Sequence, residues 1–355
     1  MLGEGAAVTL VTPERWGGAP WEAASFDGEL DIRRLPVTLH GHNHLHLYRG
    51  LGPVLESGGY DLIHVDEEPF SLVTGQVGRW ARRKGSPWVF FAWQNLAKRL
   101  PPPFGLLQRR VFREAAGAIA GSEGAARVLR SAGFAGPVLV SPQMGVAPER
   151  FRQDPTAREA RRRELGIGPS TFLVGYVGRL VPEKGVALAV QALQALPRVH
   201  LALVGGGPDA EGLARLAGRL GVSDRLHLVG AVPSLEVPEW MAALDVLVLP
   251  SRTTSGWAEQ FGRVLVEAMA CEVPVVASDS GAIPEVVGRV GRIVPEGSVQ
   301  GLAEALRDLA EDGVGRRLLG REGRVRVLAW FTHQRVVDAQ VSFYRRLLGL
   351  ERPGG

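Results

Sequence analysis

Two glutamates, Glu259 and Glu267, stand on either side of a glycine turn at Gly262. The apolar residues around Glu267 predict a helix over 262–270 that carries a carboxylate, which is unfavourable in a buried helix unless donors surround it. The valine-rich run 273–277 predicts a buried parallel strand, so the helix would direct its free N–H groups toward Glu259. Sugar hydroxyls would suit the glutamates and an attached phosphate would suit the helix end. A surface helix with a solvated Glu267 is the alternative.

Two cations, Arg179 and Lys184, follow an expected strand at 172–177, in a run that begins with Gly178 and ends with Gly185. A glycine lets a ligand approach the backbone closely. Two positive charges at the start of a helix suit a pyrophosphate, which an arginine can bind through two parallel hydrogen bonds. Surface charge exposed to solvent is the alternative.

A glycine turn that contains Gly205 and Gly207 follows the next expected strand, 199–204. It is a weak dinucleotide fingerprint, because Asp209 brings a negative charge to the place where a pyrophosphate would lie. The turn still leaves an NAD-dependent oxidoreductase open as a less favoured function.

The run E-Q-F-G-R-V-L-V-E-A-M-A-C, followed by P-V-V-A-S and G-A-I-P-E-V-V, resembles the signature of glycosyltransferase family 4. These are retaining nucleotide-sugar transferases of GT-B fold. The run from Gly178 to Gly185 resembles the family motif G-R-x-x-x-x-K-G. The resemblance extends over about residues 115–330 and is loose before them. One departure is Glu272, where the family usually has glycine.

The resemblance implies a nucleotide-sugar co-substrate of the UDP- or GDP-sugar type and no cofactor or metal. Glu259 would bind hydroxyls of the transferred sugar and Glu267 those of the ribose, while Arg179 and Lys184 would bind the donor phosphates. The predicted catalytic residues are Glu259, Arg179 and Lys184. The predicted donor-binding residues are Gly178, Arg179, Lys184, Gly205, Gly207, Val232, Glu259, Phe261, Gly262 and Glu267.

The family resemblance also implies an α/β protein of GT-B fold, with two Rossmann-like, doubly wound parallel-sheet domains that face a cleft. We expect an N-terminal acceptor-side domain over 1–165 and a nucleotide-sugar donor-binding domain over 166–330. A C-terminal helix within 331–355 would cross back to the first domain. The first expected strand, 8–11, would be the second of its sheet, so we expect that the first βα unit is missing or that the true start lies upstream of Met1. Strands of the second domain are expected at 172–177, 199–204, 226–230, 245–249 and 273–277.

Polar residues at the ends of two expected strands of the first domain are candidates for the acceptor side, since ligands bind outside such ends. They are Glu67, Glu68, Gln94 and Asn95, for which turn or capping roles are the alternative. Histidines alternate at His40, His42, His44 and His46, and in an extended chain they would share one face, as a metal site requires. No acidic or cysteine ligand is interleaved, so a loop beside the acceptor site is favoured.

Composition fits a globular enzyme, with 45% hydrophobic and 22% charged residues. The single cysteine, Cys271, excludes an internal disulfide and a cysteine-based zinc site. No apolar run reaches about 18 residues and no signal peptide opens the sequence, so we expect a cytoplasmic protein. Basic and apolar residues over 98–113 keep open a peripheral contact with the inner face of a membrane, whereas no known motif favours nucleic-acid binding.

The sequence therefore predicts a retaining glycosyltransferase of hexosyltransferase type. It would move a sugar from a nucleoside-diphosphate sugar to a sugar, lipid-linked or small-molecule acceptor. A non-catalytic GT-B-like partner or scaffold subunit with an incomplete N-terminal domain is the alternative.

Overall fold

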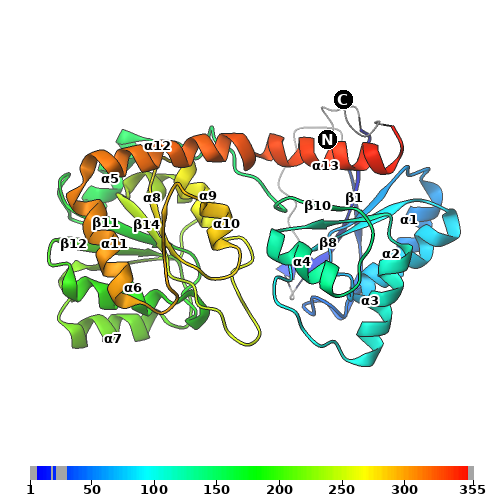
Figure 1. Ribbon diagram of the computed structural model, residues 1–355, viewed down its shortest axis with the longest axis horizontal. Coiled ribbons are helices and arrows are strands. Elements are labelled where there is room, and N and C mark those ends of the chain that lie inside the picture. Colours follow the sequence, from blue (N-terminus) through cyan, green and yellow to red (C-terminus); the bar gives the residue numbers. More distant parts are fainter. Residues whose placement is uncertain (1–5, 17–18, 21–29, 351–355) are drawn as a thin grey trace. The chain divides into compact units, whose positions relative to one another are not determined.

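The computed structural model describes residues 6–16, 19–20 and 30–350, and the chain divides into two compact units (Figure 1). Unit 1 comprises Met1–Gln143 and Val337–Gly355, and unit 2 comprises Met144–Val336. The division falls earlier than the boundary at 165 expected from the sequence. Helix α5 (Pro155–Glu164) belongs to unit 2, since its Arg158 and Arg162 both contact the Asp245 carboxylate, at 2.7 and 3.3 Å.

Unit 2 is built on a six-stranded parallel sheet in the order β13-β12-β11-β14-β15-β16. The five strands expected from the sequence are present. The sixth, β16, escaped prediction because it has three residues and begins with an exposed arginine. The chain order changes direction between β11 and β14, where ligands of such sheets bind. The strands are β11 (Phe172–Val177), β12 (Val199–Val204), β13 (Leu226–Gly230), β14 (Val246–Leu249), β15 (Val275–Ser278) and β16 (Arg292–Val294).

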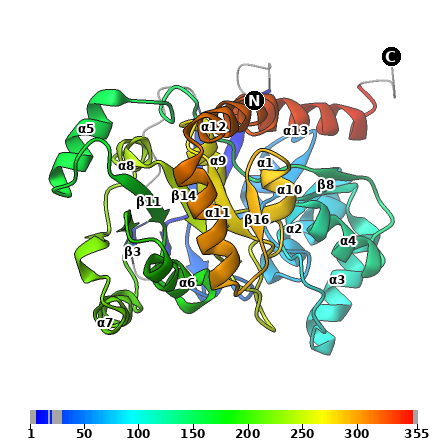
Figure 2. The same ribbon diagram turned by 60° about the vertical axis from the view of Figure 1, so that its left-hand side comes forward.

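Helices cover the sheet of unit 2 (Figure 2), which explains why its strands are nearly continuous apolar runs. The long helix α12 lies against α9, where a Cβ on Gly323 would come within 3.1 Å of Met269 Cγ. Besides α5, the helices are α6 (Val186–Ala192), α7 (Ala210–Leu220), α8 (Val237–Ala243), α9 (Arg263–Ala270), α10 (Ile283–Val287), α11 (Val299–Glu311) and α12 (Gly313–Trp330).

Unit 1 contains a four-stranded parallel sheet in the order β10-β9-β8-β7 and a separate parallel pair, β1-β4. Two short antiparallel pairs are also present: β2-β3 lies between β1 and β4 in the sequence, and β5-β6 lies between β4 and β7. The bounds are β1 (Thr9–Pro13), β2 (Arg15–Trp16), β3 (Ala19–Pro20), β4 (Asp31–Leu35), β5 (Val37–Thr38), β6 (Leu47–Tyr48), β7 (Ile63–Val65), β8 (Trp88–Ala92), β9 (Gly117–Ala120) and β10 (Val138–Val140).

The helices of unit 1 are α1 (Leu51–Ser57), α2 (Leu72–Lys84), α3 (Pro102–Glu114) and α4 (Glu123–Ser131). The part of α13 (His333–Leu347) that follows Val336 also belongs to unit 1, where Phe343 packs against Val89, Phe91 and Ile119. The Tyr344 hydroxyl is 2.8 Å from Nδ1 of His64, whose pKa burial lowers to about 4.

Candidate functional site

Glycines hold the loops after β11 and β12 together at the carboxyl edge of the unit 2 sheet. The Gly178 N–H donates to the Val204 carbonyl at 2.9 Å. A Cβ on Gly205 would lie 1.9 Å from the Gly178 carbonyl oxygen, and one on Gly207 would lie 2.2 Å from that of Leu180. Real side chains cannot approach so closely, so these loops require glycine at both positions.

The loop after β11 also rests on the loop after β14. The turn η2 (Pro182–Lys184) ends at Gly185, which has φ +63° and would place a Cβ 2.1 Å from the Pro250 carbonyl oxygen. The Arg252 N–H donates to the Glu183 carbonyl at 2.8 Å. These backbone contacts bring Lys184, the basic residue of η2, to the end of β14.

The Glu259 carboxylate lies at the centre of this arrangement and is only 6% exposed. Its Oε2 accepts hydrogen bonds from Lys184 Nζ at 2.6 Å and from the Ser251 hydroxyl at 2.7 Å. The Lys184 ammonium also lies 5.0 Å from the centre of the Trp257 ring. The opposite charge compensates the loss of hydration that burial imposes on Glu259.

Helix α9 begins shortly after Glu259, at a glycine in the left-handed region. Gly262 has φ +74°, and its carbonyl accepts from the Leu265 N–H at 2.8 Å. Phe261, which precedes it, packs edge-to-face on Phe331 with the ring centres 5.8 Å apart. The free N–H groups of the first turn of α9 therefore start close to the buried carboxylate in sequence.

Glu267 is 8% exposed and lies one turn into α9. Burial raises the pKa of its carboxyl group, and Arg263 opposes that shift through an ion pair with 3.0 Å between Nε and Oε1. The prediction of a buried carboxylate on this helix is confirmed, and an arginine one turn earlier partners it.

The remaining predicted donor residues lie at the same sheet edge. Arg179 is in the loop after β11 with an exposed side chain, while its carbonyl accepts from the Tyr176 hydroxyl at 2.7 Å. Val232 follows β13, whose last residue, Gly230, accepts the Gly205 N–H at 2.7 Å. Parallel strands end on one edge, so this edge gathers cations, glycine loops and a buried carboxylate.

Three contributing residues escaped sequence reasoning: Ser251, Trp257 and Arg263. The signal for Arg263 was available, because it stands four residues before Glu267 on the predicted helix. Ser251 stands two residues after the expected strand 245–249, close to the strand end where polar residues line sites. Nothing in the local sequence indicated Trp257.

In unit 1, Glu68 connects two strand ends. It is 5% exposed, and its Oε1 accepts the N–H groups of Trp93 and Gln94, both at 2.9 Å. Burial raises the pKa of Glu68 to about 7, and these two hydrogen bonds oppose that shift. Asn95 lies beside the start of α4, since a Cβ on Gly124 would come within 3.3 Å of its Cβ. Glu68 thus makes the contacts expected if it has a turn or capping role.

Glu67 lies in a more polar group. Burial first, and then the charges of Asp66 and Glu68, raise its pKa to about 7, whereas a hydrogen bond opposes the shift. That bond comes from the Ser71 hydroxyl at 3.2 Å, and His44 Nδ1 is 3.0 Å from the same hydroxyl. A carboxyl group with such a pKa can exchange a proton near neutral pH.

The alternating histidines do not share a face. Residues 40–46 form turns, with the His46 N–H donating to the His42 carbonyl at 3.3 Å, so the period of an extended strand does not apply. His46 is buried, whereas His40, His42 and His44 are exposed. Over the described part of the chain, no three His, Cys, Asp or Glu side chains are grouped as a metal ion requires.

Two family models match the chain. The model described as "Glycosyl transferases group 1" matches residues 157–326, and the "Glycosyl transferase 4-like domain" matches residues 1–143. The chain belongs to the group 1 glycosyl transferases. The resemblance to glycosyltransferase family 4 inferred from the sequence is thereby confirmed.

Two curated glycosyltransferases are similar to the chain in sequence. A GDP-mannose-dependent alpha-(1-6)-phosphatidylinositol monomannoside mannosyltransferase of Mycolicibacterium smegmatis is 39% identical over 188 residues, which cover 51% of this chain and 49% of that protein. A D-inositol 3-phosphate glycosyltransferase of Mycobacterium marinum is 31% identical over 316 residues, which cover 83% of this chain and 65% of that protein. The chain thus spans about half the length of the mannosyltransferase and about two thirds of the inositol phosphate enzyme.

Solved structures of GT-B glycosyltransferases resemble the chain. Anabaena HepE in complex with UDP aligns with a TM-score of 0.73 at 25% identity, covering 84% of this chain and 82% of that one. A sucrose-phosphate synthase of Thermosynechococcus elongatus aligns with a TM-score of 0.76 at 25% identity. The alignment covers 99% of this chain and 91% of that one. The predicted GT-B fold is confirmed. None of the described helices has the length and apolar composition needed to span a membrane.

Proposed function

We propose that this glycosyl transferase is a retaining enzyme that moves a sugar from a nucleoside-diphosphate sugar to an acceptor hydroxyl. The observation that carries the proposal is the 2.6 Å contact between Lys184 and the buried Glu259. It joins a cation suited to phosphate and a carboxylate suited to hydroxyls at one sheet edge, which is what a sugar attached to a diphosphate requires.

In the proposed complex, Arg179 and Lys184 bind the diphosphate and Glu259 accepts hydrogen bonds from hydroxyls of the transferred sugar. Glu267 would receive the ribose hydroxyls, and the backbone of Phe261 and Gly262 would face the sugar and the phosphate. Close approach of the diphosphate is supported by Gly178, Gly205 and Gly207, which carry no side chain. We propose that the base lies near Val232.

The proposed reaction breaks the bond between the sugar C1 and the diphosphate oxygen and forms a bond from C1 to the acceptor oxygen on the same face. The acceptor proton passes to the departing diphosphate oxygen, so no protein nucleophile is needed. The developing negative charge is on the leaving diphosphate, where Arg179 and Lys184 would stabilise it. We propose that neither a cofactor nor a metal ion takes part.

The names of relatives support the donor and acceptor classes. HepE has been solved with UDP and with UDP-glucose, and the mycobacterial relatives are named for GDP-mannose and for inositol phosphate. We propose a UDP- or GDP-sugar donor and a sugar, lipid-linked or small polyol acceptor, with the reaction in the cytoplasm or at the inner face of a membrane. Glu67, with its raised pKa and its position after β7, is the acceptor-side residue that we favour.

A product assay tests this proposal. The full chain is incubated with UDP- and GDP-sugars and a panel of sugar and inositol acceptors, and the released diphosphate and the anomeric configuration of the product are measured. Retained configuration with stoichiometric diphosphate supports the proposal. An inverted product, or NAD turnover without diphosphate release from any donor, contradicts it.

A further inference from the structure

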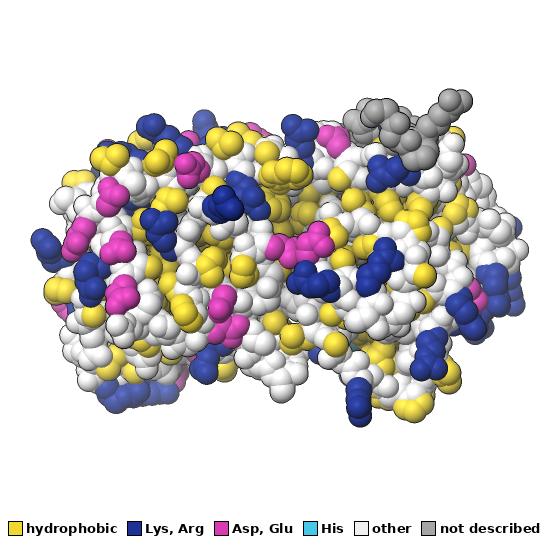
Figure 3. Space-filling model, in the orientation of Figure 1, with side chains coloured by type: hydrophobic (Ala, Val, Ile, Leu, Met, Phe, Trp, Pro, Cys, Tyr) yellow, Lys and Arg dark blue, Asp and Glu magenta, His cyan; other side chains and the backbone are white. Residues whose placement is uncertain are grey.

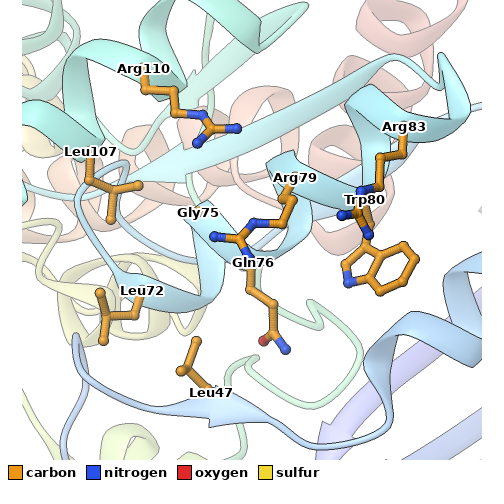
Figure 4. Close-up of a pocket in the computed structure, with 9 residues that line it drawn as sticks. All are labelled: Leu47, Leu72, Gly75, Gln76, Arg79, Trp80, Arg83, Leu107 and Arg110. Carbon is orange, nitrogen blue, oxygen red and sulfur yellow. The ribbon is translucent and has the colours of Figure 1, made fainter.

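Unit 1 contains a pocket of about 410 Å³ between helices α2 and α3 (Figure 4). None of the residues that line it belongs to the predicted donor or acceptor residues. Its volume lies in the range of about 300–1,000 Å³ that is typical of small-molecule sites. The proposed transfer reaction assigns no role to this pocket.

Three arginines line one part of the pocket. Figure 4 shows the Arg110 side chain extending from α3 above the Arg79 side chain on α2, while the guanidinium group of Arg83 lies beside the Trp80 ring. The distance from Arg83 Cζ to the centre of that ring is 5.2 Å. No acidic side chain lines the pocket, so three like charges stand around one space.

Arg110 is held at the wall by a single carboxylate. Its Nε donates to Glu114 Oε1 at 3.0 Å, and the same oxygen accepts from Arg82 at 3.3 Å. Its Nη2 is buried and has no hydrogen-bond partner among the described residues. A buried donor without an acceptor is unfavourable, and a turn of the guanidinium group toward an anionic ligand would supply the missing acceptor.

The rest of the lining is apolar, with three leucines and a tryptophan. Two glycines let these side chains pack closely against the helix backbones. A Cβ on Gly75 would lie 2.5 Å from Leu107 Cδ1, and a Cβ on Gly52 would lie 2.4 Å from the Trp80 ring. The floor is therefore built by close packing of α1, α2 and α3. The apolar residues are Leu47, Leu72, Trp80 and Leu107.

Gln76 locks the strand β6 onto α2 beside the pocket. Its amide nitrogen donates to the Tyr48 carbonyl at 2.7 Å, and its amide oxygen accepts the Tyr48 N–H at 3.1 Å. This pairing fixes Leu47, the neighbour of Tyr48, at the rim. The pocket is thus held by hydrogen bonds as well as by packing.

We propose that this pocket binds a phosphate group that carries an apolar chain. The guanidinium groups of Arg79 and Arg110 would share the phosphate oxygens, as arginines do in bidentate phosphate binding. Arg83 adds a third cation, and the leucines contact the chain. Figure 3 shows Lys and Arg side chains gathered over the region of α2 and α3 with few acidic ones among them. That field favours an anionic ligand at a distance as well.

The same chemistry exists in two forms, a phosphorylated amphiphile free in solution and the headgroup of an anionic phospholipid in a bilayer. Inorganic phosphate provides the anion without the chain. Three probes therefore separate the contributions: dihexanoyl-phosphatidylglycerol below its micelle concentration, inorganic phosphate, and phosphatidylcholine vesicles with and without phosphatidylglycerol.

The variant Arg79→Gln/Arg83→Gln removes two cations from the pocket. Arg109→Gln/Arg113→Gln is its matched control, because it removes the same charge at the same spacing from exposed positions of α3 that do not line the pocket. Titration calorimetry on the full chain measures binding of the soluble probes, and sedimentation measures binding to vesicles.

We expect the protein to bind the short-chain lipid, the phosphatidylglycerol vesicles, or both, and the pocket variant to lose affinity by about tenfold or more while the control keeps it. Binding of the soluble lipid identifies a free ligand, and binding to the vesicles alone identifies the bilayer. The proposal is overturned if neither lipid form binds, if inorganic phosphate binds as tightly as the short-chain lipid, or if the control variant loses as much affinity as the pocket variant.

Discussion

The carboxyl edge of the unit 2 sheet, which is the proposed donor edge, and the acidic group of unit 1, Asp66, Glu67 and Glu68, hold their polar residues by different means. At the proposed donor edge, backbone carbonyls stand about 2 Å from where glycine Cβ atoms would be, and a lysine pairs with the buried Glu259. In the acidic group, Glu67 and Glu68 are near each other and have raised pKa values, with hydrogen bonds from a hydroxyl and from backbone N–H groups.

This difference separates two kinds of site. Loops that contact one another through backbone atoms hold a fixed geometry. Such an edge suits the binding of a chemical group that is the same in many substrates. Neighbouring carboxyl groups whose pKa values burial raises respond to pH and suit a part of the reaction that involves a proton. Variants that change one region and leave the other intact test the distinction.

The largest effect is expected from Glu259→Gln, which removes the charge that pairs with Lys184 and keeps the shape. The proposed function predicts a loss of transfer rate of about 100-fold or more, since one polar contact to the reacting group is worth that much in comparable sites. Rates are measured with saturating donor, with Glu311→Gln, at an exposed glutamate of α11 outside the predicted site, as control. Full activity of the Glu259 variant would remove this residue from the site.

Gly185→Ala should destabilise the protein next most strongly. Its φ of +63° and the Pro250 carbonyl oxygen at 2.1 Å from the new Cβ together predict a loss of about 3 kcal/mol in the free energy of unfolding. Gly221→Ala is the matched control, because Gly221 has φ +67° with nothing within 4 Å of the Cβ, and should lose only about 1 kcal/mol. Equal losses in urea unfolding would show that backbone contact between loops is unimportant.

In the acidic group, Glu67→Gln should change the pH dependence of stability. The folded-state pKa of Glu67 is raised to about 7, so its contribution to stability is present at acidic pH and is lost as the pH rises through 7. We expect the Tm of the parent protein to fall between pH 5 and 8 and the variant to show a shallower fall. Glu56→Gln, at an exposed glutamate of α1, should keep the parent slope, and an unchanged slope in the Glu67 variant would contradict the raised pKa.

The smallest effect is expected at Glu272, which follows α9 with φ +58°. Because this left-handed conformation disfavours residues with a Cβ, Glu272→Gly should be more stable than Glu272→Ala by about 1 kcal/mol. Both variants lose the hydrogen bond from Gln153 Nε2 to Glu272 Oε2 at 3.0 Å, so their comparison isolates the backbone term. An alanine variant as stable as the glycine variant in thermal melts would contradict this.

The arrangement of residues at the proposed donor edge could be read from the sequence better than that of the acidic group, for a physical reason. Short loops after parallel strands require particular residues at fixed spacing, so Gly178, Lys184 and Glu259 could be found from local patterns. The left-handed φ of Glu272 also explains why glycine is usual there in the family resembled by the sequence.

Other features depend on tertiary contacts that no local pattern reveals. The histidines at 40–46 alternate in the sequence, which in an extended strand would place them on one face. The chain forms turns there, so that common face does not exist. Trp257 reaches Lys184 only because the loop after β14 folds over η2. The pocket between α2 and α3 likewise joins residues from three separate segments.

Direct binding of UDP and GDP to the full chain tests the central claim that the unit 2 edge is a nucleotide-sugar donor site. Titration calorimetry should show one site per chain for at least one of the two, with binding weakened about tenfold or more by Lys184→Ala and unchanged by Glu67→Gln. Absence of binding for both nucleotides, or binding that Lys184→Ala leaves intact, would contradict the account.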